Sequence, residues 1–133
     1  MGYHLILRLV DDRVLAPDPA ARRRLAAIVL RVGRRRGLLA FGCADTHLHV
    51  LTVADRATAG ALAHALAVAL RAALDLPVAF EIARIRPIQD QRHLVSAFAY
   101  VQTNAARHGI ADPVVTEASS LHDLLGLRVG AEW

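Results

Sequence analysis

Two histidines, His47 and His49, stand two residues apart in the apolar run 46–53. In a β-strand, successive side chains point to opposite faces, so residues two apart share a face. Two adjacent imidazoles favour a metal site, because imidazole is the commonest metal ligand in proteins. The alternative is a pair of core histidines bonded to the backbone or to Asp45, since buried polar groups need hydrogen-bond partners.

The third ligand would decide which metal the histidine pair holds. Cys43 lies four residues before His47, and a Cys-His-His set would suit zinc. A lone cysteine, however, commonly behaves as a small buried hydrophobe. An oxygen ligand would instead favour Mg²⁺ or Mn²⁺, with open positions for phosphate and water. We expect Mg²⁺ or Mn²⁺, with zinc as the alternative.

A second pair of chemically capable residues lies about fifty positions further on. Tyr100 and Asn104 are four residues apart in a helical pattern, so they share one helix face. A metal pair on a strand that faces a tyrosine on a helix suggests phosphodiester chemistry. The alternative for Tyr100 is an ordinary aromatic of an amphipathic helix that includes Val95, Phe98 and Val101. Spacing alone favours that alternative.

Apolar periodicity and capping residues predict the elements that must position these side chains. Helix starts are indicated by Asp18 with Pro19 at the first helical position, by Asp55 and by Asp90. We expect strands over 3–10, 38–43, 46–53 and 77–85, and helices over 19–36, 56–74 and 91–107, the last one ending before Gly109. A further short helix is expected over 119–125.

This order of elements predicts an α+β fold. The first six elements match the ferredoxin-like, or split βαβ, arrangement βαββαβ, in which helices pack on one face of an antiparallel sheet. An additional C-terminal helix carries Tyr100. The sequence has no internal repeat, low-complexity segment or linker, so we expect residues 1–133 to form a single domain.

The charged residues favour a polyanionic partner. All 16 basic residues are arginines, and the formal net charge is +4. Arginine can bind a phosphate through two parallel hydrogen bonds, which lysine cannot do. The best candidates for contacts with a DNA backbone are two clusters that bracket the first predicted helix, with a solvated helix face as the alternative. They are Arg22, Arg23, Arg24, Arg34, Arg35 and Arg36.

Other features exclude several classes of protein. One cysteine cannot form an internal disulfide and fits a reducing cytoplasm. No uncharged apolar stretch approaches the roughly 20 residues that span a bilayer, so we expect no membrane association. The chain begins directly with an alternating strand pattern and has no charged-then-apolar leader, so we expect a cytoplasmic protein and not a secreted one.

Several segments resemble a known family in the same order along the chain. Residues 99–110 are similar to the Tyr-Ile-x-x-Asn-Pro-Val-Arg-Ala-Gly-Leu block of the single-tyrosine HUH transposases, particularly the REP-associated tyrosine transposases. Residues 47–51, His-Leu-His-Val-Leu, resemble the His-Val-His-Leu-Leu segment that names the superfamily. Residues 3–6 are similar to the family's first strand, and 119–126 are similar to its Trp-Ser-Ser…Leu-Gly tail.

The resemblance implies a transposase or endonuclease that nicks and joins single-stranded or hairpin DNA. In such enzymes the tyrosine, here Tyr100, attacks a backbone phosphorus and leaves a 5′-phosphotyrosine and a free 3′-hydroxyl. The matching residues imply an Mg²⁺ or Mn²⁺ site on His47, His49 and Asn104. The family includes monomers and dimers that share sites in trans, so a homodimer is one of two states open to the chain.

Four positions depart from the family pattern. Asp45-Thr46 replaces the usual Pro-Asn, Ala105 replaces the proline after the helix asparagine, and Ala118 replaces the tail tryptophan. None of these changes removes a candidate catalytic group. They allow a domesticated module that binds DNA without cutting it, which is the first alternative. The second alternative is a zinc-binding domain that uses Cys43.

Overall fold

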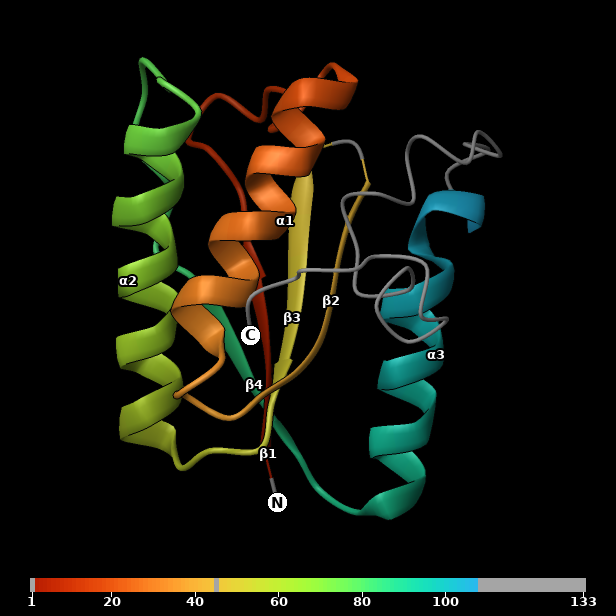
Figure 1. Cartoon of the computed structure of the whole chain (residues 1–133). Helices are drawn as coiled ribbons and strands as arrows, with labels where there is room; N and C mark the ends of the chain where they lie inside the picture. The colour runs from red at the N-terminus through yellow and green to blue at the C-terminus, as the bar shows by residue number, and fades with distance from the viewer. Residues whose placement is uncertain (1, 45, 108–133) are drawn as a thin grey trace.

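The computed structural model describes residues 2–44 and 46–107, with residues 44 and 102–107 described by their backbone alone. In these residues, four strands and three helices follow one another in the predicted order (Figure 1). In chain order they are β1 (Gly2–Leu7), α1 (Pro19–Gly33), β2 (Leu38–Ala44), β3 (His47–Thr52), α2 (Arg56–Ala73), β4 (Arg84–Ile88) and α3 (Gln91–Arg107). The expected helix stop at Gly109 and the short helix over 119–125 lie outside the described residues.

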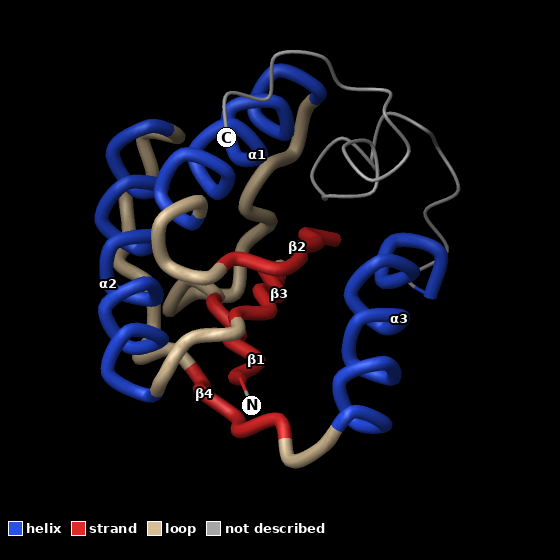
Figure 2. The backbone as a smooth tube through the Cα atoms, turned by 60° about the horizontal axis from the view of Figure 1, so that its bottom comes forward, coloured by secondary structure: helices blue, strands red, loops and turns tan. Residues whose placement is uncertain are grey.

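The strands form one antiparallel sheet in the order β2-β3-β1-β4. β1 and β3 are therefore its central strands, and β2 and β4 are its edges. Helices α1 and α2 lie on one side of the sheet and α3 lies on the other (Figure 2). The predicted fold class, an α+β βαββαβ sheet with an additional helix that carries Tyr100, is confirmed.

The helix starts are confirmed at the level of hydrogen bonds. The Asp18 carboxylate accepts a hydrogen bond from the Ala21 amide at 2.8 Å, and the Asp55 carboxylate accepts one from the Thr58 amide at 2.7 Å. Each aspartate satisfies an amide that the first helical turn leaves without a partner. Pro19 follows Asp18 at the first helical position, where its missing N–H costs nothing.

The main hydrophobic core lies between the sheet and the α1–α2 layer. Leu25 and Val29 of α1 and Leu66 of α2 are fully buried there against Leu48 and Val50 of β3. A smaller apolar cluster lies under α3 on the opposite face. Its buried members are Ala40, Leu51, Ile88, Ala97 and Val101. The two faces of one sheet thus carry very different amounts of apolar packing.

The fourth strand lies further along the chain than predicted. Residues 77–83 are irregular apart from an isolated bridge between Leu9 and Phe80, and β4 begins only at Arg84. The apolar alternation was misleading because Phe80 packs against the core from irregular chain, whereas Ile82 is 98% exposed. β4 instead contains Pro87, which an edge strand tolerates because its outer N–H groups need no strand partner.

The other boundaries differ by only a few residues. Helix α1 ends at Gly33 instead of Arg36, and the chain turns before Gly37, whose φ of 73° suits a residue without a side chain. The first strand is shorter than expected because only Leu9 continues the pairing beyond Leu7. Among the described helices, none is both long enough and apolar enough to cross a membrane.

Candidate functional site

The candidate site lies on the α3 face of the sheet, to which both histidine side chains of β3 point. Leu48 and Val50 point into the main core, so the alternation of side chains directs His47 and His49 to the opposite face. The centroids of the two imidazole rings are 6.2 Å apart. The prediction that the two rings share a face of a central strand is confirmed.

A third histidine joins this pair. His4 of β1 comes beside His49 of β3 because these strands pair in antiparallel register, with Ile6 opposite His49 and His4 opposite Leu51. Nε2 of His4 lies 3.0 Å from Nδ1 of His49, and the ring centroids are 5.2 Å apart. Sequence reasoning assigned His4 no role in the site. The only available signal was its place in a predicted strand, which does not reveal which strand lies alongside.

His4 is electrically neutral at pH 7. Burial, followed by the electrostatic effects of Arg86 and His93, lowers the pKa of His4 from its ordinary 6.5 to about 4. A neutral imidazole carries one N–H donor and one acceptor nitrogen. His4 can therefore accept a hydrogen bond at Nε2 from the N–H of His49 Nδ1, in which case the second nitrogen of His49, Nε2, carries the lone pair that binds metals.

The ring of His47 is held in the same way. The Thr46 hydroxyl lies 2.9 Å from Nδ1 of His47. Both histidines of the pair are thus hydrogen-bonded at Nδ1, one to a hydroxyl and one to an imidazole. This is the arrangement of metal-binding histidines, which bond a second group through one nitrogen and the ion through the other. It also gives a partner to Nδ1 of His49, a ring that is only 6% exposed.

Helix α3 brings the tyrosine to these rings. The Asp90 carboxylate accepts a hydrogen bond from the His93 amide at 2.8 Å, which starts the helix as predicted. Two turns later, the ring centroid of Tyr100 lies 5.3 Å from that of His49, with the rings nearly perpendicular at 80°. It lies 6.5 Å from that of His4. The structure therefore brings Tyr100 next to the histidines.

A glycine allows α3 to approach the sheet closely. Gly42 of β2 is paired with His49 and lies on the same face. A Cβ atom at this position would collide with the backbone carbonyl of Val101, the neighbour of Tyr100. Any larger residue at position 42 would push the helix away from the histidines, so this glycine helps to set the distance between Tyr100 and the sheet.

Asn104 lies on α3 one turn after Tyr100, as predicted from the spacing. Its side chain is outside the described part of the structure, so its proposed role as a ligand stays a prediction. Within the described residues, no three His, Cys, Asp or Glu side chains are grouped to hold a metal ion. The candidate ligand set therefore remains two imidazoles and an amide.

A cavity of about 230 Å³ opens beside Tyr100 and the histidine pair. Ile6 of β1 and Arg84 of β4 line it together with an ion pair, in which Nε of Arg8 lies 2.7 Å from a Glu81 carboxylate oxygen. Its lining combines imidazoles, basic side chains and the ring of Tyr100. Such a space suits an anionic group.

Cys43, the predicted zinc ligand, lies on the opposite side of the sheet from the histidine pair. Cys43 is buried in the main core beside Leu48, whereas Gly42 faces α3. The sheet therefore separates the thiol from the imidazoles, and Cys43 does not join His47 and His49 at one ion. The zinc alternative in that form is not supported by the geometry.

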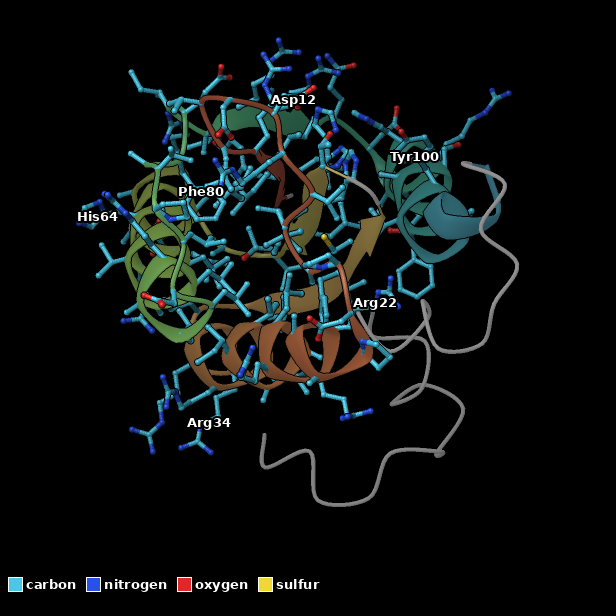
Figure 3. The ribbon with its side chains drawn as sticks, turned by 90° about the horizontal axis from the view of Figure 1, so that it is seen from above. Asp12, Arg22, Arg34, His64, Phe80 and Tyr100 are labelled. Atoms are coloured by element: carbon cyan, nitrogen blue, oxygen red, sulfur yellow. The ribbon has the colours of Figure 1, made fainter. Side chains whose placement is uncertain are left out.

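The predicted arginine clusters also belong to the α1–α2 side. Figure 3 shows Arg22 and Arg34 at the two ends of α1, with the sheet between this helix and Tyr100. Arg22 donates a hydrogen bond to the Pro17 carbonyl at 3.3 Å, and Arg36 donates one to the Val32 carbonyl at 2.8 Å. The other four members of the two clusters, Arg23, Arg24, Arg34 and Arg35, are exposed.

Comparison with solved structures identifies a similar fold. The structure of a REP-associated tyrosine transposase bound to a REP hairpin matches this chain with a TM-score of 0.71. The chain shares the fold of that transposase. The match covers 99% of this chain and 84% of the transposase at 16% sequence identity. The resemblance inferred from the motifs is thus confirmed by the three-dimensional structure.

Comparisons at the level of sequence find no match. No protein-family model matches the chain, and no curated protein matches it. The likeness to the transposase therefore lies in the fold, while most of the residues have changed. At 16% identity, the roles of individual side chains must be argued from their own positions.

Proposed function

We propose that the protein nicks and rejoins single-stranded DNA, with Tyr100 as the nucleophile. The observation that carries the proposal is the position of the Tyr100 ring, 5.3 Å from His49 and beside a cavity that the histidine pair lines. The transposase of the same fold is bound to a REP hairpin, which supports DNA as the substrate class. Hairpin-bearing DNA is the substrate we favour.

We infer that His47 and His49 hold Mg²⁺ or Mn²⁺, with the amide oxygen of Asn104 as the third ligand. The hydrogen bonds at Nδ1 of both rings fit this role because they orient Nε2 for a metal. Two nitrogens and one oxygen leave positions for phosphate and water. When bound, the ion would polarise the scissile phosphate and offset charge on its oxygens.

The covalent step is carried by Tyr100. Its phenolic oxygen forms a bond to the phosphorus while the bond from phosphorus to the 3′-oxygen breaks. The phenol loses its proton and the departing 3′-oxygen gains one, so the products are a 5′-phosphotyrosine and a 3′-hydroxyl. One phosphodiester replaces another, and attack by a second 3′-hydroxyl can therefore join strands without an external energy source.

Helix α3 contributes by holding the phenol against the site. The alignment of nucleophile and phosphorus replaces a bimolecular encounter with a fixed approach, which lowers the entropic cost of the reaction. His4 is a positioning residue that acts through His49. As a neutral acceptor for the N–H of His49, it keeps this ring in the orientation and tautomer that a metal ligand needs.

The arginines of α1 are assigned to DNA outside the cleavage site. Arg22 and Arg34 lie across the sheet from Tyr100, so the runs Arg22–Arg24 and Arg34–Arg36 suit the backbone of a folded part of the substrate. We propose that the protein works in the cytoplasm, where such DNA is accessible. A homodimer would be compatible with this arrangement, as would a monomer.

A non-cleaving DNA-binding module is the second candidate function. The observation that favours it is that the buried His49 ring has a partner for Nδ1, the His4 ring, without any metal. Such a module would use the same fold to hold hairpin DNA and would leave its phosphodiester bonds intact.

A covalent-adduct assay separates the two functions. End-labelled single-stranded hairpin DNA would be incubated with the protein in Mn²⁺, Mg²⁺, Zn²⁺ or a chelator, and then analysed on a denaturing gel. We expect a protein–DNA adduct in Mn²⁺ and Mg²⁺ that is absent with the chelator. Hairpin DNA that binds but stays intact under every metal would contradict nicking and support the binding module.

A further inference from the structure

The strand at the edge of the sheet carries a second set of arginines, on the same face as Tyr100. Arg84 and Arg86 of β4 are two residues apart, so their side chains leave the strand on one face about 7 Å apart. Pairing with β1 sets Arg84 opposite Ile6 and Arg86 opposite His4. His4 is part of the candidate site, so both arginines belong to the α3 face.

Both arginines are close to the site by independent measures. Arg84 lines the cavity that also contains Tyr100 and His49. Arg86 lies directly opposite His4, whose ring is hydrogen-bonded to that of His49. The two guanidinium groups thus flank the histidines along one edge, beside the space that opens next to the phenol.

The charge of these two arginines is not offset locally. Both residues are exposed, and within residues 2–44 and 46–107 neither forms an ion pair. Arg8 lies near them but is paired with Glu81, which also neutralises the one carboxylate that lines the cavity. The edge beside the cavity therefore presents net positive charge to an anionic ligand.

We propose that Arg84 and Arg86 bind successive phosphates of the single strand and guide it along β4 into the cavity beside Tyr100. This inference rests on the proposed function and adds the path of the substrate. A single strand has exposed phosphates along its whole length, and arginine binds them through paired hydrogen bonds. The edge strand is also open on its outer side, so a flexible chain can approach it directly.

A simpler role for these arginines is protection of the sheet edge. Charged side chains and proline on an edge strand discourage pairing with other strands, and β4 has both. Edge protection requires charge on the strand but no nucleic acid. The two roles therefore differ in how strongly single-stranded binding depends on these two positions.

The test measures binding of a fluorescent oligothymidylate by anisotropy at several salt concentrations, with a chelator present so that no strand is cut. Arg84→Ala/Arg86→Ala is compared with Arg56→Ala/Arg71→Ala, which removes the same charge from exposed positions of α2. Each phosphate contact on a single strand contributes about 0.7 to the slope of log K against log salt. We expect the β4 variant to lose about 1.4 from this slope and the α2 variant to keep it.

A charge-conserving variant separates binding from folding. Arg84→Lys/Arg86→Lys should restore most of the slope, because lysine keeps the point charge, and circular dichroism should show that all variants are folded. An unchanged slope in the β4 alanine variant would overturn the inference, as would equal losses in the β4 and α2 variants. Absence of salt-dependent binding by the unaltered protein would also overturn it.

Failure of the inference differs from failure of the proposed function. If the unaltered protein forms adducts while the β4 variant binds the oligothymidylate normally, the nuclease stands and the path along β4 is wrong. If no adduct forms in any metal but binding still depends on Arg84 and Arg86, the path is supported and the nuclease is wrong.

Discussion

The two faces of this sheet do different kinds of work. The face under α1 and α2 is an apolar core with fully buried leucines, whereas the face under α3 holds a smaller apolar cluster. Beside this smaller cluster lie three histidines and Tyr100, with the arginines of β4 at the edge. One face stabilises the fold, and the other, which is less completely packed, has room for chemistry.

Strand β3 belongs to both faces at once. Its odd-numbered residues His47 and His49 lie on the site side, and Leu48 and Val50 lie in the core. Because these residues are direct neighbours in sequence, the rigidity of the core is transmitted to the imidazoles by the backbone alone. Sites built on central strands hold their side chains more accurately than sites built on loops.

The largest difference between the faces should appear at the two described tyrosines. Tyr100 lies beside the histidines, whereas Tyr3 packs against the main core. Tyr100→Phe removes only the nucleophilic oxygen, so adduct formation should fall by about 1000-fold or more. Anisotropy with hairpin DNA should show binding largely unchanged.

Tyr3→Phe is the matched control for that variant, since it removes the same hydroxyl from the other face. Its adduct yield should equal that of the unaltered protein. Adducts that persist in Tyr100→Phe would show that another residue is the nucleophile.

Neighbouring positions on β3 should separate stability from metal binding. Leu48→Ala leaves a cavity in the core and should lower the free energy of unfolding by about 2–5 kcal/mol. His47→Ala affects a half-buried ring outside that core, so the loss should stay below about 1 kcal/mol. Urea titration measures both, and electron paramagnetic resonance measures bound Mn²⁺.

The Mn²⁺ measurement should give the opposite order. His47→Ala should lose the ion, while Leu48→Ala, at temperatures where it is folded, should retain it. If His47→Ala bound Mn²⁺ as well as the unaltered protein does, the histidine pair would be a structural feature of the sheet and not a ligand set.

His4 should have a smaller effect, because it acts through His49. His4→Leu removes the acceptor for the His49 ring, and loss of such an orienting group typically weakens metal binding by about 10–100-fold. His4→Gln retains an acceptor oxygen and should recover part of this loss. Titration of Mn²⁺ followed by electron paramagnetic resonance gives the affinities directly.

His64 serves as the control for His4, since it is an exposed histidine of α2 on the other side of the sheet. His64→Gln should leave the Mn²⁺ affinity unchanged. Equal affinities for His4→Leu and the unaltered protein would show that the ring of His49 is held without His4.

The features of this structure that depend on residues close together in the sequence could be predicted from the sequence. Caps at Asp18, Asp55 and Asp90 act within one helical turn, and the alternation that places His47 and His49 on one face acts within one strand. These features need no knowledge of the rest of the fold, and the structure confirms them.

The features that were missed depend on which strands become neighbours. His4 reaches His49 through the pairing of β1 with β3, and Arg86 reaches His4 through the pairing of β1 with β4. Sequence patterns do not contain the register of strands that are far apart in the chain. Clustering in sequence also did not reveal on which side of the sheet the arginines lie: Arg22, at the start of the run 22–24, is on the opposite side from Tyr100.

The smallest expected effect comes from the glycine at the contact between β2 and α3. In Gly42→Ala, the added methyl group collides with the Val101 carbonyl. Because α3 is held by only a small apolar cluster, it can move outward, so the cost in stability should be near the lower end for overpacking, about 1 kcal/mol. The same movement carries Tyr100 away from His49 and should slow adduct formation by about tenfold.

Gly60→Ala provides the opposite case on the other side of the sheet. Gly60 lies within α2, and an added Cβ would meet only the mobile end of the Arg56 side chain at 3.1 Å. Alanine favours the helix, so this variant should gain about 0.5–1 kcal/mol and keep its adduct rate. Urea titration and the adduct assay together test the comparison. If Gly42→Ala lost stability without slowing adduct formation, the close contact of α3 would serve the fold and not the position of Tyr100.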